Sequence, residues 1–331
     1  MKICIFGAGA IGGFMAAHLG RAPEVEVSVV ARGAHLEAIR RDGMKIVLPN
    51  ETFTTRVRAT DDALELGRQD VVIVALKQHQ VSPALEAIVP LIDDATTVVP
   101  PTTGIPYWYF YGLPGANRDR QIDALDPGGA QWRMLGPERA VGCVYWVACE
   151  VTAPGTVTHD GAFANFPIGE PDGSTSPRIA ALGAAMGAGG LNAPIVHDIR
   201  AWLWMKMISS LAWNPVAVLT LATNGEIAKH PEVVAIVRRM MEEAGRLAAR
   251  FGVVDMPMSI DERLGLGLSI VNHKMSMLQD LERGRPPEAA VLLDSLAAMR
   301  ALADVRTPTI DAVTALLALR VAQLHAAPPA R

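Results

Sequence analysis

An apolar run followed at once by closely spaced glycines limits what the N-terminal part of this chain can fold into. Ile3–Phe6 is apolar, and the next six residues are Gly7, Ala8, Gly9, Ala10, Ile11 and Gly12. A GxGxxG pattern that follows a strand and opens a helix is typical of a dinucleotide-binding βαβ unit. The glycines permit a tight turn, a close approach of the backbone to a pyrophosphate, and close packing of helix on strand. We therefore expect all six residues to contact a cofactor; the alternative is a glycine-rich turn without a ligand.

The end of the second expected strand indicates which dinucleotide binds. That strand covers Val25–Ala31, and Arg32 follows it where NAD-binding proteins usually have Asp or Glu. A carboxylate there would repel a 2′-phosphate, whereas a guanidinium pairs with it in a forked geometry. The position favours NADP(H), and the alternative is a solvated arginine on the surface.

Two more apolar runs, Val71–Leu76 and Thr97–Val99, continue the strand pattern of the first half. Strands separated by helical stretches predict parallel βαβ units. Residues 102–137 are rich in Gly, Pro and aromatic side chains and are expected to form an elaborated loop. Val141–Val147 and Ala162–Ile168 are expected to be later, antiparallel strands.

Helical patterns dominate from about residue 197, over 198–222, 230–252, 287–303 and 309–325. The predicted fold class is therefore α/β. We expect an N-terminal Rossmann-type, NADP-binding domain over residues 1–196. An all-helical substrate and catalytic domain is expected over residues 197–331.

Composition excludes several other classes of protein. The chain has 331 residues and a formal net charge of −4, without runs of Lys or Arg, so we expect neither a nucleic-acid partner nor a membrane surface. The three cysteines lack CxxC spacing and the eight histidines lack ligand spacing, so we expect neither disulfides nor a metal site. An uncharged stretch over 207–225 is long enough to span a membrane, but its Ser, Asn and Pro residues favour a buried helix. We expect a cytoplasmic protein.

Three polar residues recur along one of the apolar helical stretches. Lys206, Ser210 and Asn214 are spaced i, i+4 and i+8, which puts them within an arc of about 80° on one helix face. A lysine among Trp and Met side chains is expected to be partly buried, which lowers its pKa and suits it to donate a proton. The alternative is a lysine that reaches water beside structural polar residues. Pro215 is expected to bend or end this helix just after Asn214.

A second polar segment lies near the start of another expected helix. Pro287 and Glu288 fit the first turn of a helix, where proline is tolerated and a carboxylate faces the positive end of the dipole. On this evidence alone, Glu288 is a helix-start residue rather than a catalytic one.

Taken together, these segments resemble the ketopantoate reductase (2-dehydropantoate 2-reductase) family over nearly the whole chain. The motifs that carry the resemblance are Gly7–Gly12, Leu76–Gln80, Trp204–Lys206, Asn214-Pro215, Asn224–Glu226, and Ser276–Asp280 with Glu288 twelve residues after the serine.

The resemblance implies an NADPH-dependent reduction of a 2-oxo acid to a 2-hydroxy acid, with 2-dehydropantoate to pantoate, a step of pantothenate biosynthesis, as the first candidate. It implies that Lys206 is the general acid and that Glu288 lies near the nicotinamide ribose and this lysine. It also assigns cofactor contacts to Arg32, Lys77 and Thr103, and substrate contacts to Thr103, Ser210, Asn214, Asn224 and Ser276.

Three residues depart from the family's pattern. Many members have Asn where this chain has Thr103, often Asn where it has Ser210, and usually an acidic residue where it has Ala290. The first two positions are expected to touch substrate, so a reductase of a different 2-oxo acid on the same scaffold is one alternative. A catalytically weak NADP(H)-binding sensor is the other, although a protein that only binds would not need Lys206 and Glu288. The sequence leaves a homodimer open.

Overall fold

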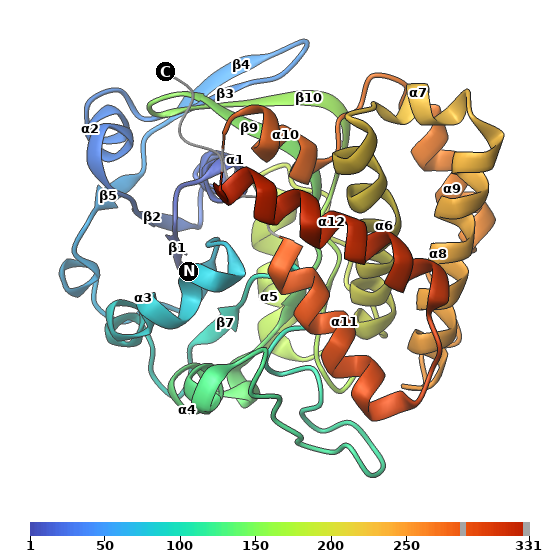
Figure 1. Ribbon diagram of the computed structural model, residues 1–331. Helices are drawn as coiled ribbons and strands as arrows, with labels where there is room; N and C mark the ends of the chain where they lie inside the picture. Colours follow the sequence, from blue (N-terminus) through green and yellow to red (C-terminus); the bar gives the residue numbers. More distant parts are fainter. Residues whose placement is uncertain (285–288, 327–331) are drawn as a thin grey trace. The chain divides into compact units, whose positions relative to one another are not determined.

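The chain folds into two compact units, Met1–Ile199 and Arg200–Arg331. A computed structural model describes residues 1–284 and 289–326, without the side chains of 160–162 and 324–326. Strands are confined to the first unit and the described part of the second is helical (Figure 1). The expected α/β class, a Rossmann-type domain followed by a helical domain, is confirmed.

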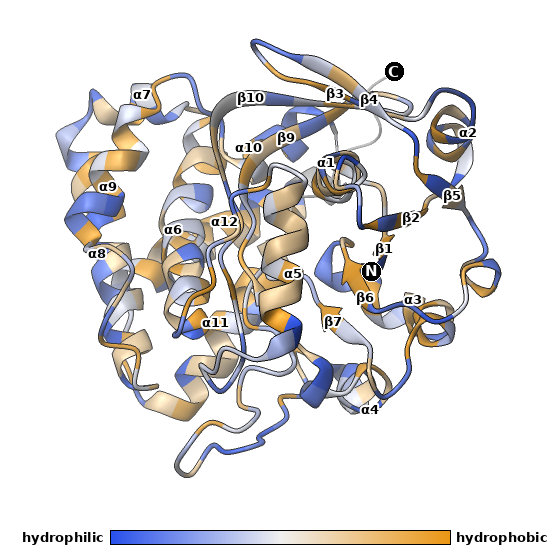
Figure 2. Ribbon diagram, turned by 180° about the vertical axis from the view of Figure 1, so that it is seen from behind, coloured by the Kyte–Doolittle hydropathy of each residue, from blue (hydrophilic) through white to orange (hydrophobic). Residues whose placement is uncertain are grey.

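The first unit is built on a parallel sheet in the order β5–β2–β1–β6–β7. Its strands, in chain order, are β1 (Lys2–Phe6), β2 (Glu26–Val30), β5 (Arg58–Thr60), β6 (Val71–Val74) and β7 (Thr97–Val99). All four residues of β6 are buried, and Figure 2 shows this strand as uniformly hydrophobic. A strand buried on both faces shows a continuous apolar run rather than an alternating one, which is why the sequence located it.

Helix α1 (Ala10–Leu19) is buried over eight of its ten residues because it contacts two sheets. It packs on β1 and β2 of the parallel sheet and on strands of a second sheet, ordered β4–β3–β10–β9. The second sheet contains β3 (Met44–Val47), β4 (Thr52–Thr55), β9 (Trp146–Ala153) and β10 (Thr156–Asn165). The remaining long helices of this unit are α2 (Gly33–Asp42), α3 (Val81–Ile88) and α5 (Pro177–Ala188).

Each of the two later strands expected from the sequence is divided in the structure. The run 141–147 separates into β8 (Gly142–Cys143) and the start of β9, and 162–168 separates into the end of β10 and β11 (Ile168–Gly169). Pro167 lies between β10 and β11 and has no N–H to continue a ladder. The pairs β9–β10 and β8–β11 are antiparallel, as expected.

The segment 102–137 is largely irregular, as expected, but it contains one α-helix, α4 (Ala130–Leu135), which follows a single 3-10 turn. The buried Asp126 carboxylate starts this helix by accepting the N–H groups of Gln131 at 2.8 Å and Trp132 at 2.9 Å. Sequence periodicity misses such a helix because six residues are too few to show a repeat.

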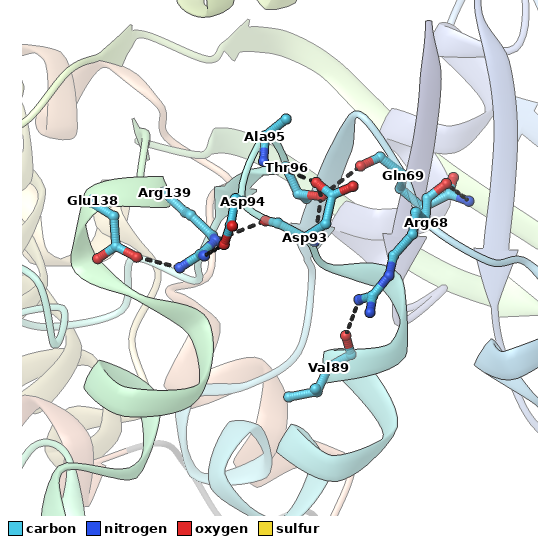
Figure 3. A network of polar contacts seen from close by, with 9 residues as sticks. All are labelled: Arg68, Gln69, Val89, Asp93, Asp94, Ala95, Thr96, Glu138 and Arg139. Atoms are coloured by element: carbon cyan, nitrogen blue, oxygen red, sulfur yellow. Dashed lines mark hydrogen bonds and ion pairs between the residues drawn. The ribbon is translucent and has the colours of Figure 1, made fainter.

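A polar network holds the turn that leads into β7 (Figure 3). The Thr96 hydroxyl donates to the Gln69 carbonyl at 2.8 Å and accepts the N–H of Asp93 at 2.9 Å. The Arg139 guanidinium donates to the Asp93 carbonyl and to the Asp94 carboxylate, each at 2.8 Å. These bonds tie the turn before β7 to Gln69, which lies just before β6. They therefore hold the two neighbouring strands, and the loop after β7, in place.

The described part of the second unit consists of α6 and the helices that follow it in the chain. Helix α6 begins at Ile199, the last residue of the first unit. They are α6 (Ile199–Thr220), α7 (Asn224–Ala228), α8 (Pro231–Ala249), α9 (Ile260–Ser269), α10 (Ser276–Glu282), α11 (Ala289–Ala303) and α12 (Pro308–Ala326). Helix α8 contacts α7, α9, α11 and α12. Its buried Glu243 carboxylate accepts the N–H groups of Thr309 and Ile310 at 3.0 Å, which neutralises the positive end of α12.

The helix expected over 198–222 is confirmed as α6, but of the two effects expected of Pro215, a bend or an end, the structure excludes the end. The helix continues through Pro215 to Thr220, and Val216, Ala217 and Val218 are buried. A proline inside a helix removes one backbone hydrogen bond, and burial of the following turn compensates for this loss. The short helices α7, α9 and α10 were not expected, since each is ten residues or shorter.

No helix in the described ranges of the chain is long and apolar enough to cross a membrane.

Replacing Thr96 by Val should lower the free energy of unfolding by about 1–3 kcal/mol, because the buried Gln69 carbonyl and Asp93 N–H both lose their partner. Thr96 is only 1% exposed, so water cannot replace the hydroxyl. Urea denaturation measures the change, with Thr52→Val on an exposed strand position as the control. Equal unfolding midpoints for the two variants would contradict the role given to this network.

Candidate active site

In the glycine loop after β1, Gly7 and Gly12 are closely packed, whereas the backbone at Gly9 faces open space. A Cβ on Gly12 would lie 1.9 Å from the Gly7 carbonyl oxygen, and Gly7 itself has φ +106° and donates its N–H to the Val30 carbonyl at 3.0 Å. By contrast, a Cβ on Gly9 would have no atom within 4 Å. No side chain caps α1 at Gly9, so the first N–H groups of this ten-residue helix remain available to an anion.

The loops that follow neighbouring strands lie at the same edge of the parallel sheet. The strand order reverses between β1 and β6, and ligands of doubly wound sheets bind at such a switch point. A Cβ on Gly7 would lie 2.7 Å from Leu76 Cδ2 and 3.0 Å from the Ala75 carbonyl oxygen, so the loops after β1 and β6 are in contact. Lys77 comes next, at the N-cap position of the short 3-10 helix η2 (Gln78–Gln80), and its backbone N–H donates to Gln80 Oε1 at 3.2 Å.

Arg32 follows β2 at this edge, is exposed, and occupies the N-cap position of α2. The neighbouring His35 accepts the Gly155 N–H at Nδ1, at 3.0 Å. Burial lowers the pKa of His35, and the Ala8 carbonyl only partly offsets this effect. Neutral imidazole is therefore favoured, and the charge that this turn presents at neutral pH comes from Arg32.

The loop after β7 contains one buried group whose bonding is incomplete. Thr102 is 3% exposed, and its hydroxyl has no hydrogen-bond partner among the described residues. Thr103, expected to touch cofactor and substrate, is half-buried beside it. The open Gly9 backbone, the uncapped α1, exposed Arg32 and the Thr102 hydroxyl all fit a bound dinucleotide.

In the second unit, α6 presents the polar residues that the sequence singled out. Lys206 and Ser210 are half-buried and Asn214 is 2% exposed. Asn214 Oδ1 accepts the N–H of Met277 at 3.1 Å and the hydroxyl of Ser276 at 3.4 Å, while its Nδ2 donates to the Ser210 carbonyl at 3.3 Å. The structure thus brings together two predicted substrate residues, Asn214 and Ser276, that are far apart in the sequence.

Asn224 is held by different neighbours. It begins α7, where Thr223 and Glu226 form a capping box, and its Nδ2 donates to the Gly267 carbonyl at 3.0 Å. Its Oδ1 is buried with no hydrogen-bond partner among the described residues. Such an acceptor could take a donor from a ligand.

Two other predicted positions have different outcomes. Glu288 lies outside the described residues, so its predicted role stays a prediction. Ala290 is an exposed residue of α11. Within the described residues, no group of three or more His, Cys, Asp and Glu side chains could hold a metal ion.

One polar contact next to the lysine was missed from the sequence. Arg263 on α9 donates from Nε to the Ser209 hydroxyl at 2.7 Å, and that hydroxyl donates to the Met205 carbonyl at 2.9 Å. Burial lowers the pKa of the Arg263 guanidinium. The capping box of Ser259 and Glu262 could have indicated where α9 begins, but not its contact with Ser209.

Known proteins match both units. The family described as "Ketopantoate reductase PanE/ApbA" matches residues 3–105, and "Ketopantoate reductase PanE/ApbA C terminal" matches residues 198–321. A 2-dehydropantoate 2-reductase of Mesorhizobium japonicum is 45% identical over 318 residues, which cover 96% of this chain and 97% of the relative.

Solved structures agree with this match. One from Ralstonia solanacearum MolK2, provisionally assigned as a ketopantoate reductase, is 36% identical with a TM-score of 0.88 and 98% coverage of both chains. The 2-dehydropantoate 2-reductase of Geobacter metallireducens GS-15 is 27% identical with a TM-score of 0.82, covering 96% of this chain and 99% of its own. The chain belongs to the ketopantoate reductase family.

Proposed function

We propose that this chain is an NADPH-dependent oxidoreductase that reduces a 2-oxo acid to a 2-hydroxy acid, with 2-dehydropantoate as its first candidate substrate. The observation that carries the proposal is the polar face of α6, where Lys206 lies one turn before Ser210 and two turns before the Asn214–Ser276 pair. Formation of pantoate places the chain in pantothenate biosynthesis. The NADPH-consumption assay with 2-dehydropantoate and a panel of 2-oxo acids tests it directly.

NADPH, when bound, would supply the hydride for this reduction. The first-turn N–H groups of α1 and the open Gly9 backbone would hold its pyrophosphate, and Arg32 would pair with its 2′-phosphate. Lys77 and Thr103 complete the cofactor contacts at the carboxyl edge of the sheet. Each of these groups follows a strand of the same parallel sheet, which fixes their relative positions.

The proton comes from the Lys206 ammonium, which passes it from Nζ to the carbonyl oxygen of the substrate while the carbonyl carbon is reduced. Ser276, Asn214, Asn224 and Ser210 orient the polar groups of the substrate. Glu288, outside the described residues, is assigned to the nicotinamide ribose and to the orientation of the lysine.

A reductase of a different 2-oxo acid is the second candidate, and Thr103 is the residue that favours it. Threonine offers one hydroxyl on a short, branched side chain, whereas the asparagine of many family members offers two donors and one acceptor. Both candidate functions act on a small-molecule substrate. A homodimer and a cytoplasmic location stay predictions.

Replacement of Arg32 by Ala should weaken NADPH binding about 10- to 150-fold and leave NADH binding unchanged, because one charge-assisted contact to the 2′-phosphate is lost. Fluorescence titration measures both dissociation constants. Arg41→Ala removes an exposed arginine of the same helix that pairs with Asp42, and should change neither constant. Equal affinities of the parent for NADPH and NADH would exclude this role.

Replacement of Lys206 by Ala should lower kcat about 10²- to 10⁴-fold, the usual contribution of a positioned general acid, without weakening NADPH binding. Lys206→Arg should be similarly impaired because a guanidinium does not release its proton at working pH. Lys45→Ala, at an exposed position of β3, is the control. A Lys206→Ala variant with near-normal kcat would remove this lysine from the mechanism.

Replacement of Thr103 by Asn should raise kcat/KM for 2-dehydropantoate about 2- to 13-fold, which is the value of one neutral hydrogen bond. Steady-state kinetics of both proteins on a panel of 2-oxo acids measures the change. If the variant instead loses activity on 2-dehydropantoate while the parent reduces another 2-oxo acid well, Thr103 is an adaptation to that other substrate.

A further inference from the structure

Helix α9 contacts α6 at two positions one turn apart. At one of them, Arg263 Nε donates to the Ser209 hydroxyl at 2.7 Å. At the other, Trp213 packs so closely on Gly267 that a Cβ there would lie 2.6 Å from the indole ring. Ser209 and Trp213 are spaced i, i+4 and so share one face of α6.

This contact face is next to the polar face of α6. Each residue advances a helix by about 100°, so Ser209 lies about 60° around the axis from Lys206, which is three residues earlier. Residues three apart on a helix are neighbours, with about 5–6 Å between their Cβ atoms. Any rotation of α6 about its axis therefore moves Ser209 and Lys206 together.

Keeping the charged Arg263 guanidinium at this partly buried place costs desolvation free energy. Ser209 is 4% exposed, and burial lowers the pKa of the Arg263 guanidinium, so the charged form is held where it is poorly solvated. Apolar side chains of similar volume often replace buried charges without loss of stability. An arginine at this place is therefore better explained by the geometry it imposes than by stability.

The bond continues into the backbone of α6. The Ser209 hydroxyl donates a hydrogen bond to the carbonyl of Met205 at 2.9 Å, and Met205 is one residue before Lys206. The same helix α9 also accepts the Asn224 side-chain amide at the Gly267 carbonyl, at 3.0 Å. Helix α9 thus contacts both the turn of α6 that contains Lys206 and, separately, the predicted substrate residue Asn224 of α7.

We propose that Arg263 is a positioning residue, which orients Lys206 for proton transfer by fixing Ser209 on the neighbouring face of α6. The inference rests on the proposed function, because it concerns the reaction in which Lys206 donates the proton. Arg263 acts through α6 and needs no contact with substrate.

Replacement of Arg263 by Gln should lower kcat about 10- to 100-fold, the cost of a displaced catalytic group, with little change in KM for NADPH. Arg263→Lys should recover most of this loss, since an ammonium can also donate to the Ser209 hydroxyl. Ser209→Ala should lower kcat to a similar extent, and the double variant should be no worse than either single one. Steady-state kinetics and circular dichroism of the folded proteins provide the measurements.

A matched control lies on the other side of α9, at its contact with α8. Arg238 of α8 makes an exposed ion pair with Asp261 of α9, so Arg238→Gln loosens α9 without touching Ser209, and should leave kcat unchanged. In a Lys206→Ala background, Arg263→Gln should change the residual rate less than about twofold, because the group it positions is gone. A general loss of structure would instead lower the rate in both backgrounds.

The outcomes separate this inference from the function on which it rests. A parent protein that reduces 2-oxo acids, together with an Arg263→Gln or Ser209→Ala variant of normal kcat, overturns the positioning role alone. A loss that persists in the Lys206→Ala background also overturns it. If the parent oxidises NADPH with none of the 2-oxo acids, the proposed function fails and the inference falls with it.

Discussion

The contact between the start of α1 and the turn after β1 determines the arrangement of the first unit. A Cβ on Gly12 would lie 1.9 Å from the Gly7 carbonyl oxygen and 2.9 Å from Ala75 Cβ. Backbone therefore packs on backbone at the reversal of strand order, and α1 begins directly over the carboxyl edge of the sheet. The uncapped N–H groups of α1 are a consequence of this packing, since the loop is too short and too rich in glycine to provide a capping side chain.

In the second unit the candidate site depends on a different constraint. Its polar atoms belong to a largely buried helix, α6. A buried polar group without a partner costs about 1–3 kcal/mol, so each one needs a bond from a neighbouring element. Asn214 obtains its partners from the start of α10, and Ser209 obtains one from α9. The short helices α9 and α10 therefore support the candidate site, since they supply these hydrogen-bond partners.

Strict spacing made some features predictable from the sequence. The GxGxxG pattern requires glycine at fixed positions, and the apolar run of β6 reflects burial on both faces, so four of the five strands of the parallel sheet could be located. The edge strand β5, three residues long, was not expected. The polar face of α6 was visible because 22 helical residues show several repeats of the 3.6-residue period. Only tertiary contacts define the remaining features. Nothing in the sequence connects Asn214 with Met277, or Arg263 with Ser209.

Pro215 illustrates why local rules fail where packing dominates. Proline in a helix interior costs about 3 kcal/mol or more, which predicts that the helix bends or ends there. The next three residues are 5% exposed or less, and each buried apolar side chain of the size of valine contributes about 1.5–3 kcal/mol. Burial of that last turn is therefore sufficient to carry α6 through the proline to Thr220. The same continuation places Asn214 inside the helix rather than at its end, where its side chain can bond both to the preceding turn of α6 and to the first residues of α10.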